Sequence, residues 1–110
     1  MITAIQHDGC GSTGSRLLRG HREAFETVER SFASFKGAER ALYFSSGYLA
    51  NLAVLTTFVE PGDVILSDRL NHASLRDGIR LSRAQRMVFP HNDAVALARL
   101  IDTTRVQGQV

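Results

Sequence analysis

Residues 41–66, ALYFSSGYLANLAVLTTFVEPGDVIL, carry the pattern that decides the fold. The short apolar run at 41–44 predicts a buried strand, and the apolar stretch at 48–59 predicts a helix that Pro61-Gly62 ends. A second apolar run at 64–66 predicts another strand. A strand, a helix and a second strand in immediate succession are typical of a βα unit in a parallel sheet.

The same alternation continues toward the C-terminus. Residues 73–81 have a helical pattern, and the run at 87–89 predicts a third strand that stops at Pro90. A last helix is expected to begin at a cap, either Asn92 or Asp93. The strand runs are continuously apolar, which indicates strands covered on both faces. The sequence therefore predicts the α/β class, with a mostly parallel sheet, covering helices and right-handed crossovers.

The N-terminal third has a different pattern. Residues 8–20 hold four glycines, which predicts an irregular loop where the backbone turns sharply or approaches another group closely. Apolar residues spaced by three and four positions over 25–35 predict a helix. Gly37 is expected to end that helix.

Composition limits the classes of function. The chain has 13 basic and 11 acidic residues without a block of like charge, and it has no Trp, so a nucleic-acid partner is not expected. The single cysteine, Cys10, excludes an internal disulfide and suits a reducing compartment. The start shows no signal-peptide pattern, and no apolar stretch is long enough to span a bilayer. We therefore expect a cytoplasmic protein without a membrane partner.

Two polar segments come directly after predicted strands, where ligands gather in parallel α/β sheets. Residues 45–47, Ser-Ser-Gly, lead into a helix, and the free N–H groups, helix dipole and hydroxyls there predict an anion site. The alternative for this segment is an ordinary N-cap serine. His72, within the Asn-His-Ala-Ser segment 71–74, could stack on a planar ring or exchange a proton. The alternative for His72 is a capping or surface histidine.

Several arginines could clamp carboxylates or phosphates, although most are expected to be solvated. These are Arg16 in the glycine loop, and Arg76, Arg80, Arg83 and Arg86 near the second helix. Residues 91–93, His-Asn-Asp, most simply predict a turn and a cap. No pair of His, Cys or carboxylate residues has metal-ligand spacing, so no metal is expected. The residues by themselves indicate a phosphate-binding α/β module.

Taken in order, these segments resemble a known family. The segments are GSTGSRLLRG, FKGAERALYFSSGYLANLAVL, GDVILSDRLNHASLRDGIRLSRA and FPHND, at 11–20, 35–55, 62–84 and 89–93. LNHASL, with SSGY before it and HND after it at these spacings, is similar to the α-oxoamine synthases. The resemblance runs from about Gly9 to Ile101.

The resemblance implies a fold and a chemistry. The fold would be that of the pyridoxal-phosphate (PLP) transferases of fold type I, which are aspartate aminotransferase-like. Residues 1–20 would form a glycine-rich active-site segment, and residues 21–110 part of the large domain. The family condenses an amino acid with an acyl-CoA thioester, using the cofactor ring as an electron sink, and its members are usually homodimers.

The resemblance also assigns residues. Ser46, Gly47 and Tyr48 match the turn that binds the cofactor phosphate, and His72 matches the catalytic histidine that stacks on the pyridine ring. Four further positions match residues near the substrates: Ser15, Arg16, Ser67 and Arg86.

The family's cofactor lysine and its pyridine-pairing aspartate match positions downstream of this segment. Lys36 is the only lysine in the chain, and by match it is a helix-end residue. We therefore expect a fragment of an acyltransferase with a leaning to the biotin-pathway branch, truncated at both ends and inactive by itself. The alternative is a free-standing, non-catalytic module that binds a phosphorylated ligand or dimerises. The sequence does not identify the acyl thioester or the amino acid.

Overall fold

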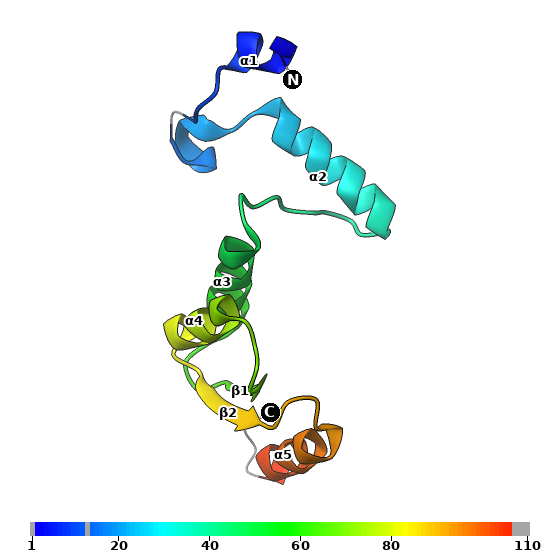
Figure 1. Ribbon diagram of the computed structural model, residues 1–110, viewed down its shortest axis with the longest axis vertical. Coiled ribbons are helices and arrows are strands. Elements are labelled where there is room, and N and C mark those ends of the chain that lie inside the picture. Colours follow the sequence, from blue (N-terminus) through cyan, green and yellow to red (C-terminus); the bar gives the residue numbers. More distant parts are fainter. Residues whose placement is uncertain (1, 13, 107–110) are drawn as a thin grey trace. The chain divides into compact units, whose positions relative to one another are not determined.

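The computed structural model describes residues 2–12 and 14–106, with the side chains of the last two of these excepted (Figure 1). The chain divides into two compact units, Met1–Tyr43 and Phe44–Val110. This division falls after Tyr43, whereas the 20/21 boundary drawn from the family resemblance stays a prediction.

The first unit contains helix α1 (Ile2–Asp8), a π-helical turn (Arg16–Gly20) and helix α2 (Glu23–Lys36). Helix α2 and its predicted stop are confirmed. Gly37 takes a left-handed conformation with φ of 65°, and the next residue's N–H bonds back to the Ala33 carbonyl, which closes the helix end.

The glycine segment has no helix or strand at the described positions 9–12 and 14–15, as predicted, and it is more regular than predicted only at its end. It ends in the π-helical turn, in which the Ser15 carbonyl accepts the N–H groups of the last three residues of the turn, at 2.8–3.1 Å. Gly20 lies directly against the backbone of Gly14. A Cβ at Gly20 would lie only 2.0 Å from the Gly14 carbonyl oxygen. Only glycine permits this close approach.

The second unit is an α/β arrangement, as predicted. Its elements are α3 (Gly47–Phe58), β1 (Val64–Asp68), α4 (Ala73–Ser82), β2 (Gln85–Phe89) and α5 (Ala94–Val106). The two strands are parallel, with Val64 opposite Gln85 and Asp68 opposite Phe89. Helix α5 contacts both strands, and α3 packs against α4 (Figure 1).

The predicted strand at 41–44 is wrong. A strand needs a neighbour for its backbone groups, and the two strands in the described part of the chain pair with each other. The backbone of Tyr43 is bonded to side chains instead, since its N–H donates to Glu29 Oε1 at 2.7 Å and its carbonyl accepts from the Arg16 guanidinium at 3.2 Å. Leu42 is 67% exposed.

The expectation that both faces of each strand are covered is also wrong for β2. Its residues are exposed or half-buried, and Val88 is 43% exposed. The apolar run at 87–89 therefore indicates a preference for strand conformation, but among the described residues it is not covered on both faces.

The contact between α3 and α4 depends on one glycine. Gly78 is buried, and a Cβ there would lie 2.7 Å from Leu55 Cδ1 and 3.4 Å from the Asn51 carbonyl oxygen. The absence of a side chain at Gly78 lets the two helix backbones approach closely, and the neighbouring Ile79 is 3% exposed.

Among the helices within 2–12 and 14–106, none has the length and apolar character that a membrane span requires.

Candidate functional site

The N-terminus of α3 combines a capped end with open donors. Ser46 has extended backbone angles, and its Oγ accepts the Leu49 N–H at 3.2 Å, so the N-cap interpretation of this serine is confirmed. The cap leaves the Gly47 and Tyr48 N–H groups without intrahelical carbonyl partners. These donors and the positive end of the helix dipole suit an anion, so the cap and the anion site are compatible.

Gly47 has no role in the packing of the described residues. A Cβ at this position would meet no atom within 4 Å, and its φ is not in the left-handed region. Neither close packing nor backbone strain therefore requires glycine here, and helix propensity disfavours it. A ligand that approaches the backbone closely would require it.

The N-terminus of α4 is capped by a histidine. His72 Nδ1 accepts the Ser74 backbone N–H at 3.2 Å and lies 2.8 Å from Ser74 Oγ. The alternative prediction, a capping histidine, is therefore confirmed. The residue is nevertheless exposed, so the cap uses one ring nitrogen and leaves the ring accessible to a ligand.

Two side-chain hydrogen bonds join the beginnings of the two helices. Tyr48 donates its hydroxyl proton to Asp77 Oδ2 at 2.9 Å, and Asn51 Nδ2 donates to Ser74 Oγ at 2.9 Å. The bond to Asp77, together with burial, raises the pKa of Tyr48 above its ordinary value of 10.0. Tyr48 therefore stays a neutral phenol at physiological pH.

The carboxyl end of β1 is closed by Asp68. Its carboxylate accepts the backbone N–H groups of Asn92 at 3.0 Å and Leu70 at 2.7 Å, and it pairs with His91 Nδ1 at 3.0 Å. The two backbone donors and then His91 lower the pKa of Asp68 from 3.8 to about 2. The predicted turn and cap at 91–93 are confirmed, since Asp93 Oδ1 accepts the N–H of Ala96 at 2.8 Å.

Two predicted substrate residues lie on the strands. Ser67 is 1% exposed, and its Oγ accepts from Asn71 Nδ2 at 3.1 Å and donates to the Asp68 carbonyl at 3.3 Å. Arg86 is exposed on β2, opposite Ile65. Neither the burial of Ser67 nor the exposure of Arg86 tests a role toward a substrate, so both assignments stay predictions.

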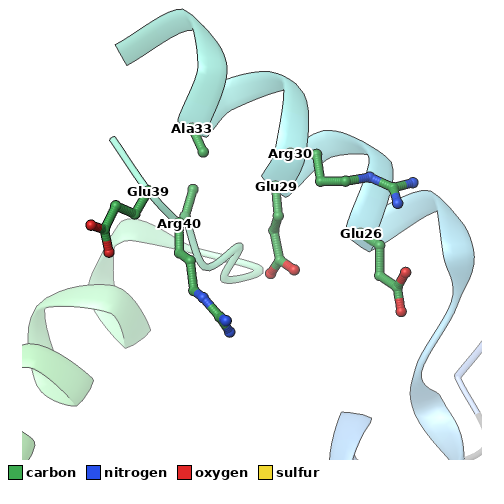
Figure 2. Close-up of a pocket in the computed structure, with 7 residues that line it drawn as sticks. Glu26, Glu29, Arg30, Ala33, Glu39 and Arg40 are labelled. Atoms are coloured by element: carbon green, nitrogen blue, oxygen red, sulfur yellow. The ribbon is translucent and has the colours of Figure 1, made fainter. Parts of the chain in front are cut away.

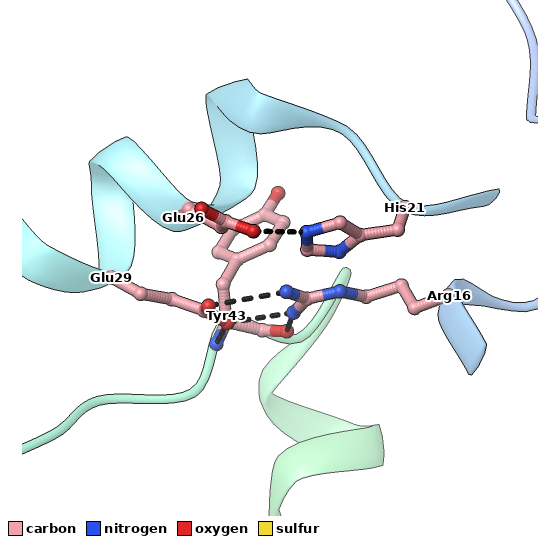
Figure 3. A network of polar contacts seen from close by, with 5 residues as sticks. All are labelled: Arg16, His21, Glu26, Glu29 and Tyr43. Atoms are coloured by element: carbon pink, nitrogen blue, oxygen red, sulfur yellow. Dashed lines mark hydrogen bonds and ion pairs between the residues drawn. The ribbon is translucent and has the colours of Figure 1, made fainter.

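The first unit holds an ion-pair network that sequence reasoning missed (Figure 3). Two guanidinium nitrogens of Arg16 donate to the Glu29 carboxylate, at 2.6 and 3.1 Å. The same guanidinium lies 5.0 Å from the centre of the Phe25 ring. Both residues also hold the backbone of Tyr43. We call Arg16, Glu29 and Tyr43 the Arg16 clamp.

The clamp has a clear electrostatic signature. The bidentate bond from Arg16, followed by the Tyr43 N–H, lowers the pKa of Glu29 from 4.5 to about 2. Beside it, His21 Nε2 lies 2.7 Å from Glu26 and lowers the pKa of that more exposed carboxyl (Figure 3). One sequence signal could have found Glu29: it lies four residues after Phe25, which puts a carboxylate on the apolar face of α2.

A pocket of about 350 Å³ opens beside the clamp in the first unit (Figure 2). Its lining mixes both charge signs: Glu26, Glu29, Arg30, Ala33, Glu39, Arg40 and Ala41. None of the residues that the sequence assigns to a ligand lines it. Within residues 2–12 and 14–106, no group of three or more His, Cys, Asp or Glu residues is arranged to hold a metal.

Comparison with known proteins identifies the family. The sequence matches the family "Aminotransferase class I and II" over residues 1–110. The chain belongs to this family. The 8-amino-7-oxononanoate synthase of Burkholderia cenocepacia strain HI2424 is 52% identical over 109 residues, which cover 96% of this chain and 27% of that protein. The chain thus spans about a quarter of the length of the curated relatives it matches.

Solved structures agree with the sequence match. The serine palmitoyltransferase of Sphingomonas wittichii superposes with a TM-score of 0.84 at 38% identity, over 89% of this chain and 25% of that one. A serine palmitoyltransferase from S. paucimobilis, solved with a bound PLP–myriocin aldimine, gives a TM-score of 0.86 at 33% identity, over 92% of this chain and 26% of that one. The predicted resemblance to the α-oxoamine synthases and the fold type I assignment are confirmed.

The relatives are PLP enzymes, and the residues of this chain fit that cofactor. A phosphate needs backbone donors and close access, which the open N–H groups at the start of α3 and the bare Cα of Gly47 offer. A planar ring needs an exposed aromatic face, which His72 offers at the start of α4. Both helix ends lie within the second unit, on helices that pack together.

Proposed function

We propose that these residues form the cofactor-holding part of a PLP-dependent acyltransferase, which condenses an amino acid with an acyl-CoA as an 8-amino-7-oxononanoate synthase does. The observation that carries the proposal is the pairing, in one compact unit, of the open α3 N-terminus with the exposed His72. The 52% identity to a synthase of that name supports the choice of reaction.

Each residue then has a defined task. The N–H groups of Gly47 and Tyr48 bind the cofactor phosphate at the positive end of α3, while the Ser46 hydroxyl keeps that end capped. His72 would offer its ring face to the pyridine ring of the cofactor. The bound cofactor supplies the electron sink for the substrate carbon.

Four residues remain proposed substrate contacts: Ser15, Arg16, Ser67 and Arg86. Among them, Arg86 is exposed on β2, which suits contact with an anionic group of the acyl substrate. Arg16 is engaged with Glu29 and Tyr43, so we propose that it shapes the glycine segment and reaches a substrate only through that segment.

We further propose that the 110 residues do not catalyse the reaction by themselves. Their single lysine, Lys36, is in the last turn of α2, with its ammonium 5.6 Å from the ring centre of Phe35. A lysine in this setting is a helix-end cation that complements the helix dipole. We also propose a homodimer in the cytoplasm, which the family membership and the exposed, unpaired Cys10 support.

The replacement Gly47→Ala tests the phosphate site in the natural protein that carries these residues. Alanine meets no neighbour and has the higher helix propensity, so the fold should be as stable as before or slightly more stable. The added methyl group blocks the approach of a phosphate, so the Kd for PLP should rise by roughly tenfold, which corresponds to the loss of about one charge-assisted hydrogen bond. Titration of the cofactor measures this Kd.

Pyridoxal without phosphate is the matched control ligand. Its Kd should be the same for Gly47→Ala and for the wild type, because it has no group at the α3 N-terminus. Equal loss of affinity for both ligands would contradict the phosphate assignment. A wild-type protein that binds inorganic phosphate but not PLP would instead favour a non-catalytic binding module.

A further inference from the structure

A chain of hydrogen bonds runs from α3 through α4 to the histidine at the candidate cofactor site. Asn51 Nδ2 lies 2.9 Å from Ser74 Oγ, and Ser74 Oγ lies 2.8 Å from His72 Nδ1. Ser74 is fully buried, at 0% exposure, although serine is a polar residue with an exposed helix end beside it. Because the buried Ser74 hydroxyl bonds to both Asn51 and His72, the orientation of the Asn51 amide affects the orientation of the His72 ring.

Two groups of Ser74 lie within hydrogen-bond distance of His72 Nδ1, its backbone N–H and its hydroxyl. The backbone N–H of Ser74 can only donate, and it points at His72 Nδ1 at 3.2 Å. The Ser74 hydroxyl is closer to Nδ1, at 2.8 Å, and it donates to Nδ1 because the Asn51 amide donates to its oxygen. With both donors directed at Nδ1, that atom accepts, and the proton of the neutral ring lies on Nε2.

We propose that Asn51 and Ser74 are positioning residues, which fix the tautomer and the ring plane of His72 for the cofactor. The inference rests on the proposed function and adds to it two residues that the family match did not assign. Helix α3 carries both the phosphate turn and Asn51, so the same rigid element places the cofactor phosphate and aims the ring that contacts the cofactor. The close contact at Gly78 keeps the two helices in register.

A simpler arrangement would make Asn51 irrelevant. The backbone bond from Ser74 already caps α4 and could by itself hold His72. The two arrangements predict different results when the Asn51 donor is replaced by an acceptor, because the backbone bond is untouched by that change.

The replacement Asn51→Asp makes that change with almost no change in volume. An ionised aspartate at position 51 accepts the Ser74 hydroxyl proton, so the hydroxyl oxygen then faces His72 Nδ1 and favours a proton there. In the natural protein without cofactor, the ring ¹⁵N shifts of His72 should report Nε2–H in the wild type and a shift toward Nδ1–H in the variant. The measurement is made at the same mildly alkaline pH for both proteins.

The same variant is then tested with ligands. The Kd of PLP should rise by roughly three- to tenfold, in line with the worth of one aromatic contact. The Kd of inorganic phosphate should stay unchanged, because Asn51 is not part of the phosphate turn. An unchanged His72 tautomer, or a changed tautomer with an unchanged PLP affinity, would overturn the inference.

Two serine variants on one helix complete the design. Ser74→Ala removes the hydroxyl and should weaken PLP binding, whereas Ser82→Ala removes another buried hydroxyl, one that donates within α4 to the Ile79 carbonyl. Ser82→Ala should leave both the His72 shifts and the PLP affinity as they are, and an equal effect of the two variants would overturn the inference. Failure of the wild type to bind PLP would refute the proposed function, while the tautomer measurement, made without cofactor, would still report on Asn51 and Ser74.

Discussion

The two units use polar groups in opposite ways. In the first unit, the Arg16 clamp joins a full positive charge to a full negative charge, and both partners also bond to the Tyr43 backbone. In the second unit, the beginnings of α3 and α4 are capped by neutral side chains and keep open donors or an exposed ring. The charges of the clamp are satisfied within the chain, whereas the neutral helix ends have capacity for a ligand.

This difference shows where an anion is expected to bind. An arginine attracts attention in a sequence because it is charged, yet Arg16 has a carboxylate at 2.6 Å that competes with any ligand. The α3 N-terminus carries no side-chain charge, and its donors are backbone groups that the helix cannot satisfy itself. A site of this kind is defined by geometry more than by composition.

The largest effect is expected from Gly78→Ala, which would break the arrangement of the two helix ends. The new methyl group would lie 2.7 Å from Leu55 Cδ1 and 3.1 Å from Leu55 Cβ, so the Leu55 side chain must change its rotamer and α3 must shift slightly. Overpacking of this kind costs about 1–3 kcal/mol of folding free energy. Denaturant unfolding of the natural protein measures the loss, and Gly47→Ala, which meets open space, is the control that should show none.

The next effect concerns the clamp. Glu29→Gln keeps the shape of the side chain but removes the charge that Arg16 grips, so the Tm of the natural protein should fall by several degrees. Glu26→Gln is the matched control, because Glu26 is on the same helix, is 51% exposed and pairs with a single histidine. A Tm that falls equally in both variants would mean that the clamp adds nothing beyond a surface ion pair.

The sequence predicted the elements whose signals are local. The stop of α2 at Gly37 and the caps at Ser46 and Asp93 arise from short-range patterns and were confirmed. The parallel pairing of β1 with β2 was expected from the alternation of strands and helices, and it was confirmed as well. The prediction of a strand at 41–44 was wrong because a strand needs a partner to pair with, and the local sequence of a segment does not identify that partner. The clamp was missed for the same reason, since Arg16 and Glu29 are brought together by the tertiary fold.

The candidate site was predictable in its position but not in its hydrogen bonds. The helix starts at Ser46 and His72 were expected from capping patterns and from the family resemblance. The bonds from Asn51 and Ser74 were not foreseen, because they depend on how α3 packs on α4, a contact that a buried glycine permits. Spacing within one helix does not reveal a contact with another.

A smaller effect separates the two tasks of His72. His72→Asn keeps a side chain that can accept the Ser74 N–H, so α4 stays capped, but it removes the ring. His72→Ala removes both, and should lower stability by about 1 kcal/mol as well. PLP affinity should fall by a similar factor in both variants, and unfolding should distinguish them. Full PLP affinity in His72→Asn would contradict the ring-stacking role.

The smallest effect is a dependence on pH that compares the two carboxylates directly. The folded-state pKa values of Glu29 and Asp68 are both lowered to about 2, from 4.5 and 3.8. A lowered pKa means that each group stabilises the fold above its ordinary pKa and loses that contribution as the pH falls toward 2. The Tm difference between the wild type and Glu29→Gln should therefore be constant above about pH 5 and shrink below it.

Asp68→Asn should show the same pH dependence, although the main donors to Asp68 are backbone N–H groups and not an arginine. Added salt should weaken the Glu29 effect more than the Asp68 effect, because ion pairs are screened more than hydrogen bonds from neutral donors. Equal salt sensitivity in the two variants would show that Glu29 and Asp68 are stabilised by the same kind of electrostatic interaction.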